Sequence, residues 1–414
     1  MITVSDLDLP AFDFTALDFT AEAYHRYLAE AREQNWLARS HMPVPVPVVL
    51  DREASEFFMR SKAIAFPGSA LADETGVMGG RVRDLIDGNM LNHSGDVHRR
   101  LRAVAQQSLS PRAADRWRPT MRNILARLWS GVEPATNCEF VAAFRRYSAL
   151  TMAAMFGAPA EDAARLDLWA MRARQQFELR ALENELVEIE RASTEIREYI
   201  GALFEQPQTA SSDSLIASLL MAEAQENGLS RKESVNLAVN VVTAGVGTTQ
   251  STLMLALRLF AEHPDQWALL AEQPELAAQA VSEVLRFEPV VPFIYRICLE
   301  QLEHRGVIFP KGTIIGICTE RANRELPIRR GNTSEQVDSE CFDITVSREN
   351  KILTFGVGAH YCLGVNVARA ELEEALKFLA PRMQGLALDG EPEVGGIRIF
   401  HEIKALPLRW AAGG

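Results

Sequence analysis

Apolar side chains recur at intervals of three and four residues along most of this chain, the spacing that places them on one face of an α-helix. Several segments begin with a typical start signal, such as Ser230 before Arg231, or Pro264 and Pro274 in a first turn. The pattern predicts helices over residues 20–34, 111–131, 139–157, 159–205, 212–227, 231–262, 265–272, 275–287 and 365–380. We therefore expect a mainly α-helical protein.

Runs typical of β-strands are fewer and shorter, at residues 43–50, 293–299, 305–318 and 396–410. The first run carries Pro43, Pro45 and Pro47, whose missing N–H groups favour the edge of a sheet. No repeat, low-complexity tract or linker divides the sequence. We expect a small β portion within one domain over residues 1–414.

Composition and charge narrow the class of protein. With 47% hydrophobic and 24% charged residues, the chain resembles an ordinary globular protein, and its net charge of −12 argues against nucleic acid as a partner. The start lacks a basic and then apolar signal segment, and polar residues interrupt the longest apolar stretch, 236–260. We expect a cytoplasmic protein with no membrane partner.

The five cysteines are odd in number and lack C-x-x-C spacing, which argues against a disulfide framework or a structural zinc site. Only Cys362 has surroundings that suggest chemistry. It lies in a loop, Phe355 to Gly364, that reads F-G-V-G-A-H-Y-C-L-G. Glycines at 356, 358 and 364 permit backbone angles that other residues resist, so the loop can wrap around one thiolate. A glycine-rich loop holding a buried structural thiol is the alternative.

This loop resembles the cysteine-ligand loop of the cytochrome P-450 superfamily, soluble bacterial type. The resemblance extends over the chain from about residue 20. It implies a single P-450-type domain in which Cys362 binds the iron of haem b, with a long distal helix over the haem and the loop beneath it. Phe355, Gly356 and Gly364 would shape the haem-binding loop.

Glu283 and Arg286 are three residues apart, so they share a helix face and can form a salt bridge. Taken alone, such a pair is most often solvated at the surface. The resemblance implies a structural role instead, fixing the fold on the cysteine side of the haem. A third arginine that many members carry is replaced here by Cys341.

Four cationic or imidazole side chains stand where the superfamily binds the two haem propionates. His98 and Arg102 are one helical turn apart in H-R-R-L-R, and Arg296 and His360 occupy the other two positions. Buried anions require paired, hydrogen-bonding cations. For any single one of these residues, a surface charge is the alternative.

The segment 231–261 carries Ala244, Gly245, Gly247 and Thr248. Each mid-helix glycine costs roughly 1 kcal/mol relative to alanine, and close approach to a flat ligand would compensate. The segment resembles the distal helix motif A-G-x-(D/E)-T-T, which implies an oxygen groove at Ala244–Gly245 and an oxygen-activating hydroxyl on Thr248. A bond from Thr248 to the carbonyl four residues back is the alternative.

Gly247 departs from that motif because the usual acid at its position relays protons. We expect water, another residue or the substrate to deliver protons, and we expect Gly247→Asp to speed oxygen activation.

The resemblance implies monooxygenation of an uncharged, mainly hydrophobic molecule of secondary metabolism, such as a terpenoid, polyketide or aromatic metabolite. No flavin domain or iron–sulfur cysteine cluster is visible, so ferredoxin and ferredoxin reductase are the expected electron donors from NAD(P)H. A peroxide-using or rearranging haem-thiolate enzyme is the alternative, given Gly247. Family alignment places the pocket walls in 66–91, 169–177 and 239–248, and at Val290, Val291, Phe293, Ile294, Ile399 and Phe400, for each of which core packing is the alternative.

Overall fold

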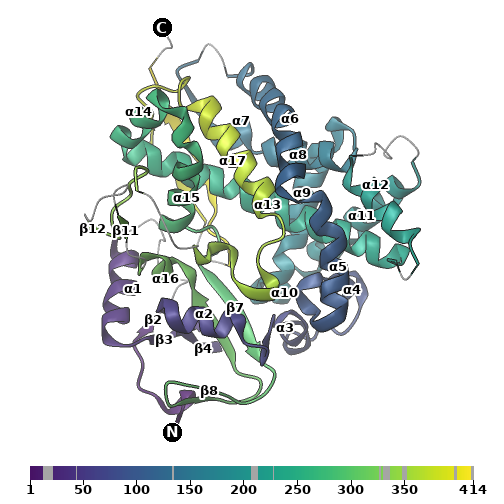
Figure 1. Ribbon diagram of the computed structural model, residues 1–414, viewed down its shortest axis with the longest axis vertical. Helices are drawn as coiled ribbons and strands as arrows, with labels where there is room; N and C mark the ends of the chain where they lie inside the picture. Colours follow the sequence, from purple (N-terminus) through teal and green to yellow (C-terminus); the bar gives the residue numbers. More distant parts are fainter. Residues whose placement is uncertain are drawn as a thin grey trace. The chain divides into compact units, whose positions relative to one another are not determined.

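Helices make up most of the protein (Figure 1), for which a computed structural model describes residues 1–12, 22–42, 44–132, 135–206, 213–226, 228–325, 328–329, 336–346, 352–395 and 399–411. The helices are α1 (Glu22–Gln34), α2 (Arg52–Arg60), α3 (Gly68–Glu74), α4 (Gly80–Asp87), α5 (Gly95–Ser108), α6 (Pro111–Trp129), α7 (Phe140–Phe144), α8 (Tyr147–Phe156), α9 (Ala163–Arg174), α10 (Leu179–Asn184), α11 (Leu186–Phe204), α12 (Leu215–Glu223), α13 (Arg231–Glu262), α14 (Pro264–Glu272), α15 (Ala277–Phe287), α16 (Thr319–Arg324) and α17 (Val365–Leu379). The predicted mainly α fold with a small β portion is confirmed.

The longest helix, α13, begins and ends where the apolar pattern predicts. Its start is fixed by a capping box, in which the Ser230 side chain accepts from the Glu233 amide and the Glu233 carboxylate accepts from the Ser230 amide. The prediction of one helix over 159–205 is wrong. A short 3₁₀ turn at Gln175–Phe177 and the extended backbone of Glu178 separate α9 from α10 and α11.

The chain folds into two compact units. Unit 1 comprises residues 1–67, 278–362 and 393–404, and unit 2 comprises residues 68–277, 363–392 and 405–414. The expectation of a single domain over residues 1–414 stays a prediction.

Unit 1 contains a six-stranded sheet in the order β2-β3-β4-β10-β7-β5. Its strands are β2 (Ala11–Phe12), β3 (Leu37–Met42), β4 (Val44–Val49), β5 (Ile64–Ala65), β7 (Phe293–Cys298) and β10 (Ile314–Cys318). The apolar face of this sheet packs against α2, where Phe58 is fully buried beside Val49 and Ile317. This core holds β7 and the start of the Cys362 loop in one body.

Smaller sheets complete the β portion. Unit 1 pairs β1 (Ile2–Thr3), β9 (Val307–Phe309) and β8 (Leu302–His304), and unit 2 pairs β13 (Ala387–Leu388), β16 (Pro407–Arg409) and β6 (Asn137–Glu139). Two-stranded pairs join β11 (Ile328–Arg329) to β12 (Gln336–Val337) and β14 (Glu393–Val394) to β15 (Ile403–Ala405).

The prediction that the proline-rich run forms an edge strand is wrong, because β4 lies between β3 and β10. Pro45 and Pro47 pair with β3, whereas pairing with β10 begins only at Val48. The missing N–H groups therefore fall where β4 has a neighbour on one side only, which is why an inner strand tolerates them. Pro43 lies outside the described residues.

Unit 2 is built around α13, which contacts α8, α9, α11 and α17. Most side chains of α13 are buried on all sides, including Leu253, Leu257 and Phe260 in its second half. A helix that is apolar all round needs neighbours on every face. This enclosure fixes the positions of Ala244, Gly247 and Thr248 within unit 2.

Candidate active site

The Cys362 loop is closed by its own backbone. The Cys362 amide donates a hydrogen bond to the Phe355 carbonyl at 2.8 Å, and the thiol is half-buried and unbridged. Gly356 and Gly358 have φ of +68° and +79°, in the left-handed region that favours glycine. The expectation that Gly364 needs an unusual backbone angle is wrong, because its φ of −84° suits any residue, and its part in binding haem stays a prediction.

Two buried side chains tie the beginning of this loop to neighbouring helices of unit 1. Thr354 donates to the Leu285 carbonyl of α15 at 2.6 Å, and Asn323 of α16 donates to the Thr354 hydroxyl at 2.9 Å. The Asn323 carbonyl in turn accepts from the Leu353 amide at 2.7 Å. Sequence reasoning missed Asn323 and Thr354, since neither belongs to a spaced motif and their contact spans thirty-one positions.

Glu283 and Arg286 form a buried bidentate pair, so the solvated alternative is ruled out for this structure. Arg286 Nε and Nη2 each lie 2.9 Å from a Glu283 carboxylate oxygen, and neither side chain is more than 1% exposed. Arg286 also donates to the carbonyls of Ser339 and Cys341, at 2.7 and 2.9 Å. The segment around residue 341 therefore contacts Arg286 through backbone carbonyls. The Cys341 side chain itself is exposed.

Arg296 is a buried cation of β7. It is 7% exposed, Nη1 donates to the Tyr295 carbonyl at 2.8 Å, and burial lowers its pKa to about 10. Among the described residues no carboxylate lies within ion-pair distance of it. A buried guanidinium without a carboxylate fits an anionic ligand group. His360, half-buried in the turn Gly358–His360, belongs to the same unit.

His98 and Arg102 lie on α5 in unit 2. His98 is 3% exposed, and its pKa is lowered chiefly by burial and further by the charge of Arg102. The imidazole is therefore neutral near pH 7 and donates through one ring nitrogen. The one-turn spacing expected from the sequence is confirmed as helix geometry, and the propionate role of both residues stays a prediction.

Four residues in the middle of α13 are not buried. Ala244 is exposed, and Val241, Gly245 and Thr248 are half-buried. The Thr248 hydroxyl donates to the Ala244 carbonyl at 2.7 Å, the local bond considered as an alternative. This bond orients the hydroxyl along the exposed face.

Both mid-helix glycines lie close to protein side chains, and the close approach of a flat ligand expected from the sequence stays a prediction. A Cβ at Gly245 would lie 2.6 Å from Cε of Met152. A Cβ at Gly247 would lie 2.9 Å from Sδ of Met171 and 3.1 Å from Nη1 of Arg174, both on α9. Gly247 is buried on this side of α13, where a side chain would meet the guanidinium.

Sequence reasoning also missed Glu371, a carboxyl of α17 buried beside α13. It is 2% exposed, and burial raises its pKa to about 8. The only signal in the sequence is an acid within the apolar pattern of residues 365–380.

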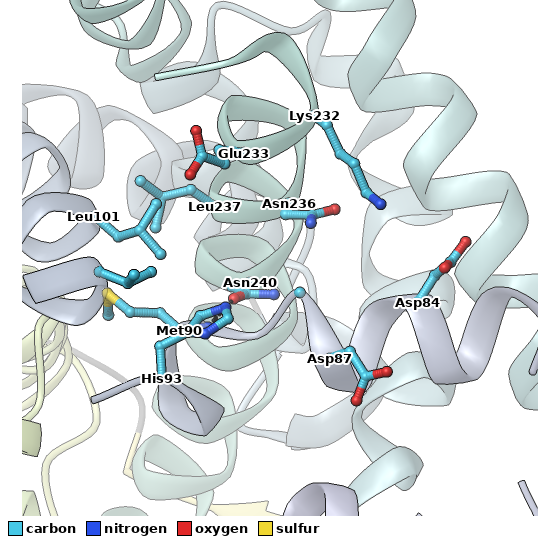
Figure 2. Close-up of a pocket in the computed structure, with 12 residues that line it drawn as sticks. Asp84, Asp87, Met90, His93, Leu101, Lys232, Glu233, Asn236, Leu237 and Asn240 are labelled. Carbon is cyan, nitrogen blue, oxygen red and sulfur yellow. Dashed lines mark hydrogen bonds between the residues drawn. The ribbon is translucent and has the colours of Figure 1, made fainter. Parts of the chain in front are cut away.

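The six residues named one by one as substrate contacts belong to unit 1, whereas the predicted pocket walls 169–177 and 239–248 belong to unit 2. Val290, Phe293 and Phe400 are buried, and Val291, Ile294 and Ile399 are partly buried. The cavity found in the described part of unit 2 is lined by residues of α4, α5, α13 and the segment between α4 and α5, and by none of these six (Figure 2). Their substrate role stays a prediction.

Comparison with known proteins decides the family. A family model described as cytochrome P450 matches residues 135–379. The chain is 34% identical over 412 residues to luteothin monooxygenase of Streptomyces thioluteus, covering 98% of this chain and 97% of that protein. It is also 28% identical over 337 residues to mycinamicin IV hydroxylase/epoxidase of Micromonospora griseorubida, covering 80% and 78%. The chain belongs to the cytochrome P450 family.

The solved structure of the cytochrome P450 PksS of the Bacillus subtilis 168 bacillaene polyketide synthase shares the fold. Its TM-score is 0.81 at 24% identity, with 97% of this chain and 100% of that chain covered. Cytochromes P450 bind haem through a cysteine thiolate, so this chain is a haem-dependent oxidoreductase and a haem-thiolate monooxygenase. In the part of the P450 that is described, no helix is both long and apolar enough to cross a membrane.

The residues of this P450 fit haem. Cys362 offers a half-buried, unbridged thiol, and Arg296 offers a buried charge without a carboxylate among the described residues. No cluster of three or more His, Cys, Asp or Glu side chains that could hold a metal ion occurs in the described ranges.

Proposed function

We propose that this P450 inserts one oxygen atom from O₂ into an uncharged, mainly hydrophobic small molecule by hydroxylation or epoxidation, with Cys362 as the haem ligand. The observation that carries the proposal is the Cys362 loop itself. The bond between the Cys362 amide and the Phe355 carbonyl closes it, and Asn323 and Thr354 anchor it to buried helices. A rigid loop holds one sulfur atom in place without flexible side chains.

Thiolate-ligated haem supplies O–O cleavage and oxygen transfer when bound. The chain's own side chains would hold it. Arg296, His360, His98 and Arg102 would bind the two propionates. Arg296 contributes a full charge in a buried place, whereas neutral His98 contributes a hydrogen-bond donor.

On α13, Ala244 and Gly245 leave room for O₂ beside the helix, and Thr248 directs a hydrogen-bonding group at it. The Thr248 hydroxyl gives its hydrogen to the Ala244 carbonyl, so its oxygen lone pairs accept from water. Water held there supplies protons in place of the acid that Gly247 lacks. The Glu283–Arg286 pair acts as a structural support for the fold around Cys362.

Electrons come from NAD(P)H through a ferredoxin and its reductase. The five cysteines, at 138, 298, 318, 341 and 362, do not have the spacing of an iron–sulfur site. A separate one-electron carrier is therefore needed twice in each reaction cycle.

A hydrophobic natural product is the proposed substrate class. The relatives' names support it, since they are a luteothin monooxygenase, a mycinamicin IV hydroxylase/epoxidase and a polyketide biosynthesis P450. The apolar residues Val290, Val291, Phe293, Ile294, Ile399 and Phe400 are the proposed substrate contacts in unit 1.

Gly247 favours a second candidate, a haem-thiolate enzyme that uses peroxide or rearranges its substrate. Such an enzyme needs no proton relay to O₂, so a missing acid at residue 247 would carry no cost. Thr248 argues for the first candidate because peroxide use does not require the hydroxyl.

The test uses the holoenzyme with a ferredoxin, its reductase, NADPH and isotopically labelled O₂, against a panel of terpenoids, polyketide lactones and aromatic metabolites. The proposal predicts a product that carries one labelled oxygen atom and depends on NADPH. Label entering only from labelled hydrogen peroxide, with no product from O₂ and NADPH, would support the second candidate instead.

A further inference from the structure

A cavity of about 320 Å³ lies in unit 2 between α4, α5 and the first half of α13 (Figure 2). Asp84 and Asp87 of α4 stand on one side of it, and Leu101 of α5 stands on the other. Its lining residues Leu101 and Leu237 are only 5% and 2% exposed. A molecule larger than water therefore makes full contact with them only if a wall moves, and α4 is the shortest of the three helices.

The C-terminal end of α4 is fixed to α13. The Met90 amide, just beyond the helix, donates to Oδ1 of Asn240 at 2.9 Å. Gly88 lies so close to Asn236 that a Cβ on it would approach Nδ2 to 2.3 Å. Both asparagines are only 8% exposed. Buried side chains of the longest helix thus hold this end of α4 in place.

The N-terminal end of α4 has no cap of its own. Its N-cap residue is Gly79, which offers no side chain, and its first turn contains no acidic residue. The first amides of a helix have no acceptor within the helix, so a side chain usually supplies one. Here the acceptor comes from another helix.

Glu190 of α11 caps this end of α4. One carboxylate oxygen accepts from the Arg81 amide, and the other accepts from the Val82 amide at 2.8 Å. Gly80 permits the close approach, since its φ is +85° and a Cβ there would lie 2.9 Å from a Glu190 oxygen. The positive end of the helix dipole also favours a carboxylate at this place. A single side chain, 109 positions from Arg81, therefore fixes the free end of α4.

Apolar packing joins α4 to the same neighbour and not to the helices across the cavity. The cluster that contains Val82 and Ile86 of α4 also contains Ala181 and Leu182 of α10 and Ile189 of α11, and none of its members belongs to α5 or α13. The contacts that keep the cavity closed are thus this cluster and the two bonds to Glu190. A helix held by so few contacts is expected to open locally without unfolding of the whole protein.

We propose that Glu190 is a positioning residue that holds α4 as a wall of the cavity, and that the cavity opens when the N-terminal end of α4 leaves Glu190. Residues 88–90 are the hinge, because Asn240 keeps them on α13. This opening goes beyond the proposed monooxygenase reaction, since it concerns how a molecule enters the cavity and not what happens to it afterwards.

The test measures opening through a thiol placed in the cavity. Leu237→Cys puts it on α13, and its reaction with N-ethylmaleimide is followed in the ferric holoenzyme by mass spectrometry of peptides, with no electron donor present. The exposed native Cys341 reacts in the same sample and serves as the internal standard. A thiol at residue 237, where the present side chain is 2% exposed, should react mainly while the cavity is open.

Glu190→Gln, made in the Leu237→Cys protein, keeps the size of the side chain but removes its charge. The new amide offers one acceptor and turns a donor towards the second N–H group. The reaction at residue 237 should become roughly tenfold faster, because hydrogen bonds to a charged group are worth more than bonds to a neutral one. Glu188→Gln makes the same substitution at an exposed position of α11 and should leave the rate unchanged.

Hydrogen exchange gives a second readout that does not require the introduced thiol. In Glu190→Gln alone, the peptide that covers residues 80–87 should exchange about tenfold faster, and the peptide from the middle of α13 should not change.

Equal labelling rates in the Glu190→Gln and Glu188→Gln proteins, or unchanged exchange of α4, would overturn the inference. Faster exchange throughout α13 would overturn it as well, since it would show a general loosening of the protein and not an opening of α4. Neither measurement uses electrons or a substrate, so failure of the monooxygenase proposal would leave both results unchanged.

Discussion

At the scale of single residues, Gly247 marks the clearest departure of this chain from the distal motif it resembles. Its α-carbon faces Met171 and Arg174 of α9, and a Cβ there would come within 3.1 Å of the Arg174 guanidinium. Any acid introduced at this position would meet a cation. The glycine allows α9 and α13 to pack closely, and we propose that other groups deliver the protons.

Gly247→Asp is expected to raise the fraction of NADPH electrons that appear in product. The gain should stay below about 10-fold, because Arg174 holds the new carboxylate in its ionised form. A well-placed general acid contributes roughly 10²- to 10⁴-fold, so this gain is a small part of that effect. Oxygen uptake and product are measured together. Gly247→Ala, which adds the Cβ without the acid, should show no gain; equal gains in both variants, or none in Asp, would show that the missing acid does not limit the reaction.

Glu371 gives the protein a pH dependence of stability. Its pKa is about 8 in the folded chain because of burial, against 4.5 for an ordinary glutamate, so the folded state keeps a proton that the unfolded state loses. The folded state is therefore favoured below pH 4.5 and loses stability as pH rises towards 8.

Glu371→Gln should remove this dependence. The difference in unfolding free energy between the variant and the wild type should grow in favour of the variant by at most ~1.4 kcal/mol per pH unit between about pH 5 and pH 8. Urea unfolding at several pH values measures it. Parallel curves for the two proteins would contradict a protonated, buried Glu371.

At the scale of elements, the Cys362 loop depends on two glycines out of three. Gly358 has φ of +79°, and a Cβ there would lie 3.2 Å from the Met59 carbonyl of α2. Gly364 has φ of −84° and no atom within 4 Å of a Cβ. The left-handed backbone angles of the loop thus lie before Cys362. After it, the loop joins α17 with backbone angles that any residue can adopt.

Gly358→Ala should destabilise the loop by about 1–2 kcal/mol from the left-handed backbone alone, plus the cost of moving Met59. Gly364→Ala is the matched control and should change stability by less than about 0.5 kcal/mol. Thermal unfolding and haem retention of the two holoenzymes measure the difference. Similar losses in both variants would contradict the assigned roles.

The elements also show what a single sequence can and cannot predict. The ends of α13 follow from its capping box and apolar pattern, and the spacing of Glu283 and Arg286 predicts their pairing. The inner position of β4 was not predictable, since pairing with β10 depends on residues more than 260 positions away in the chain. The break after α9 was missed because apolar spacing continues through it.

At the scale of the whole molecule, the motifs that identify the family are spread along the chain, from His98 to Cys362, and the comparisons confirm the family they imply. The motifs do not predict the properties of side chains that depend on contacts between segments distant in the sequence. The Asn323–Thr354 bond, the burial of Glu371 and the bonds of Glu190 to α4 each depend on neighbours from other segments. None of these contacts has a signature in local sequence.

The absorbance spectrum of the reduced holoenzyme under carbon monoxide tests whether Cys362 is the haem ligand. We expect the red-shifted band typical of thiolate ligation in the wild type. The control variant Cys341→Ser, which replaces an exposed cysteine, should keep that band. Cys362→Ser should lose it. A thiolate band that persists in Cys362→Ser, or a wild-type band typical of histidine ligation, would show that Cys362 is not the ligand.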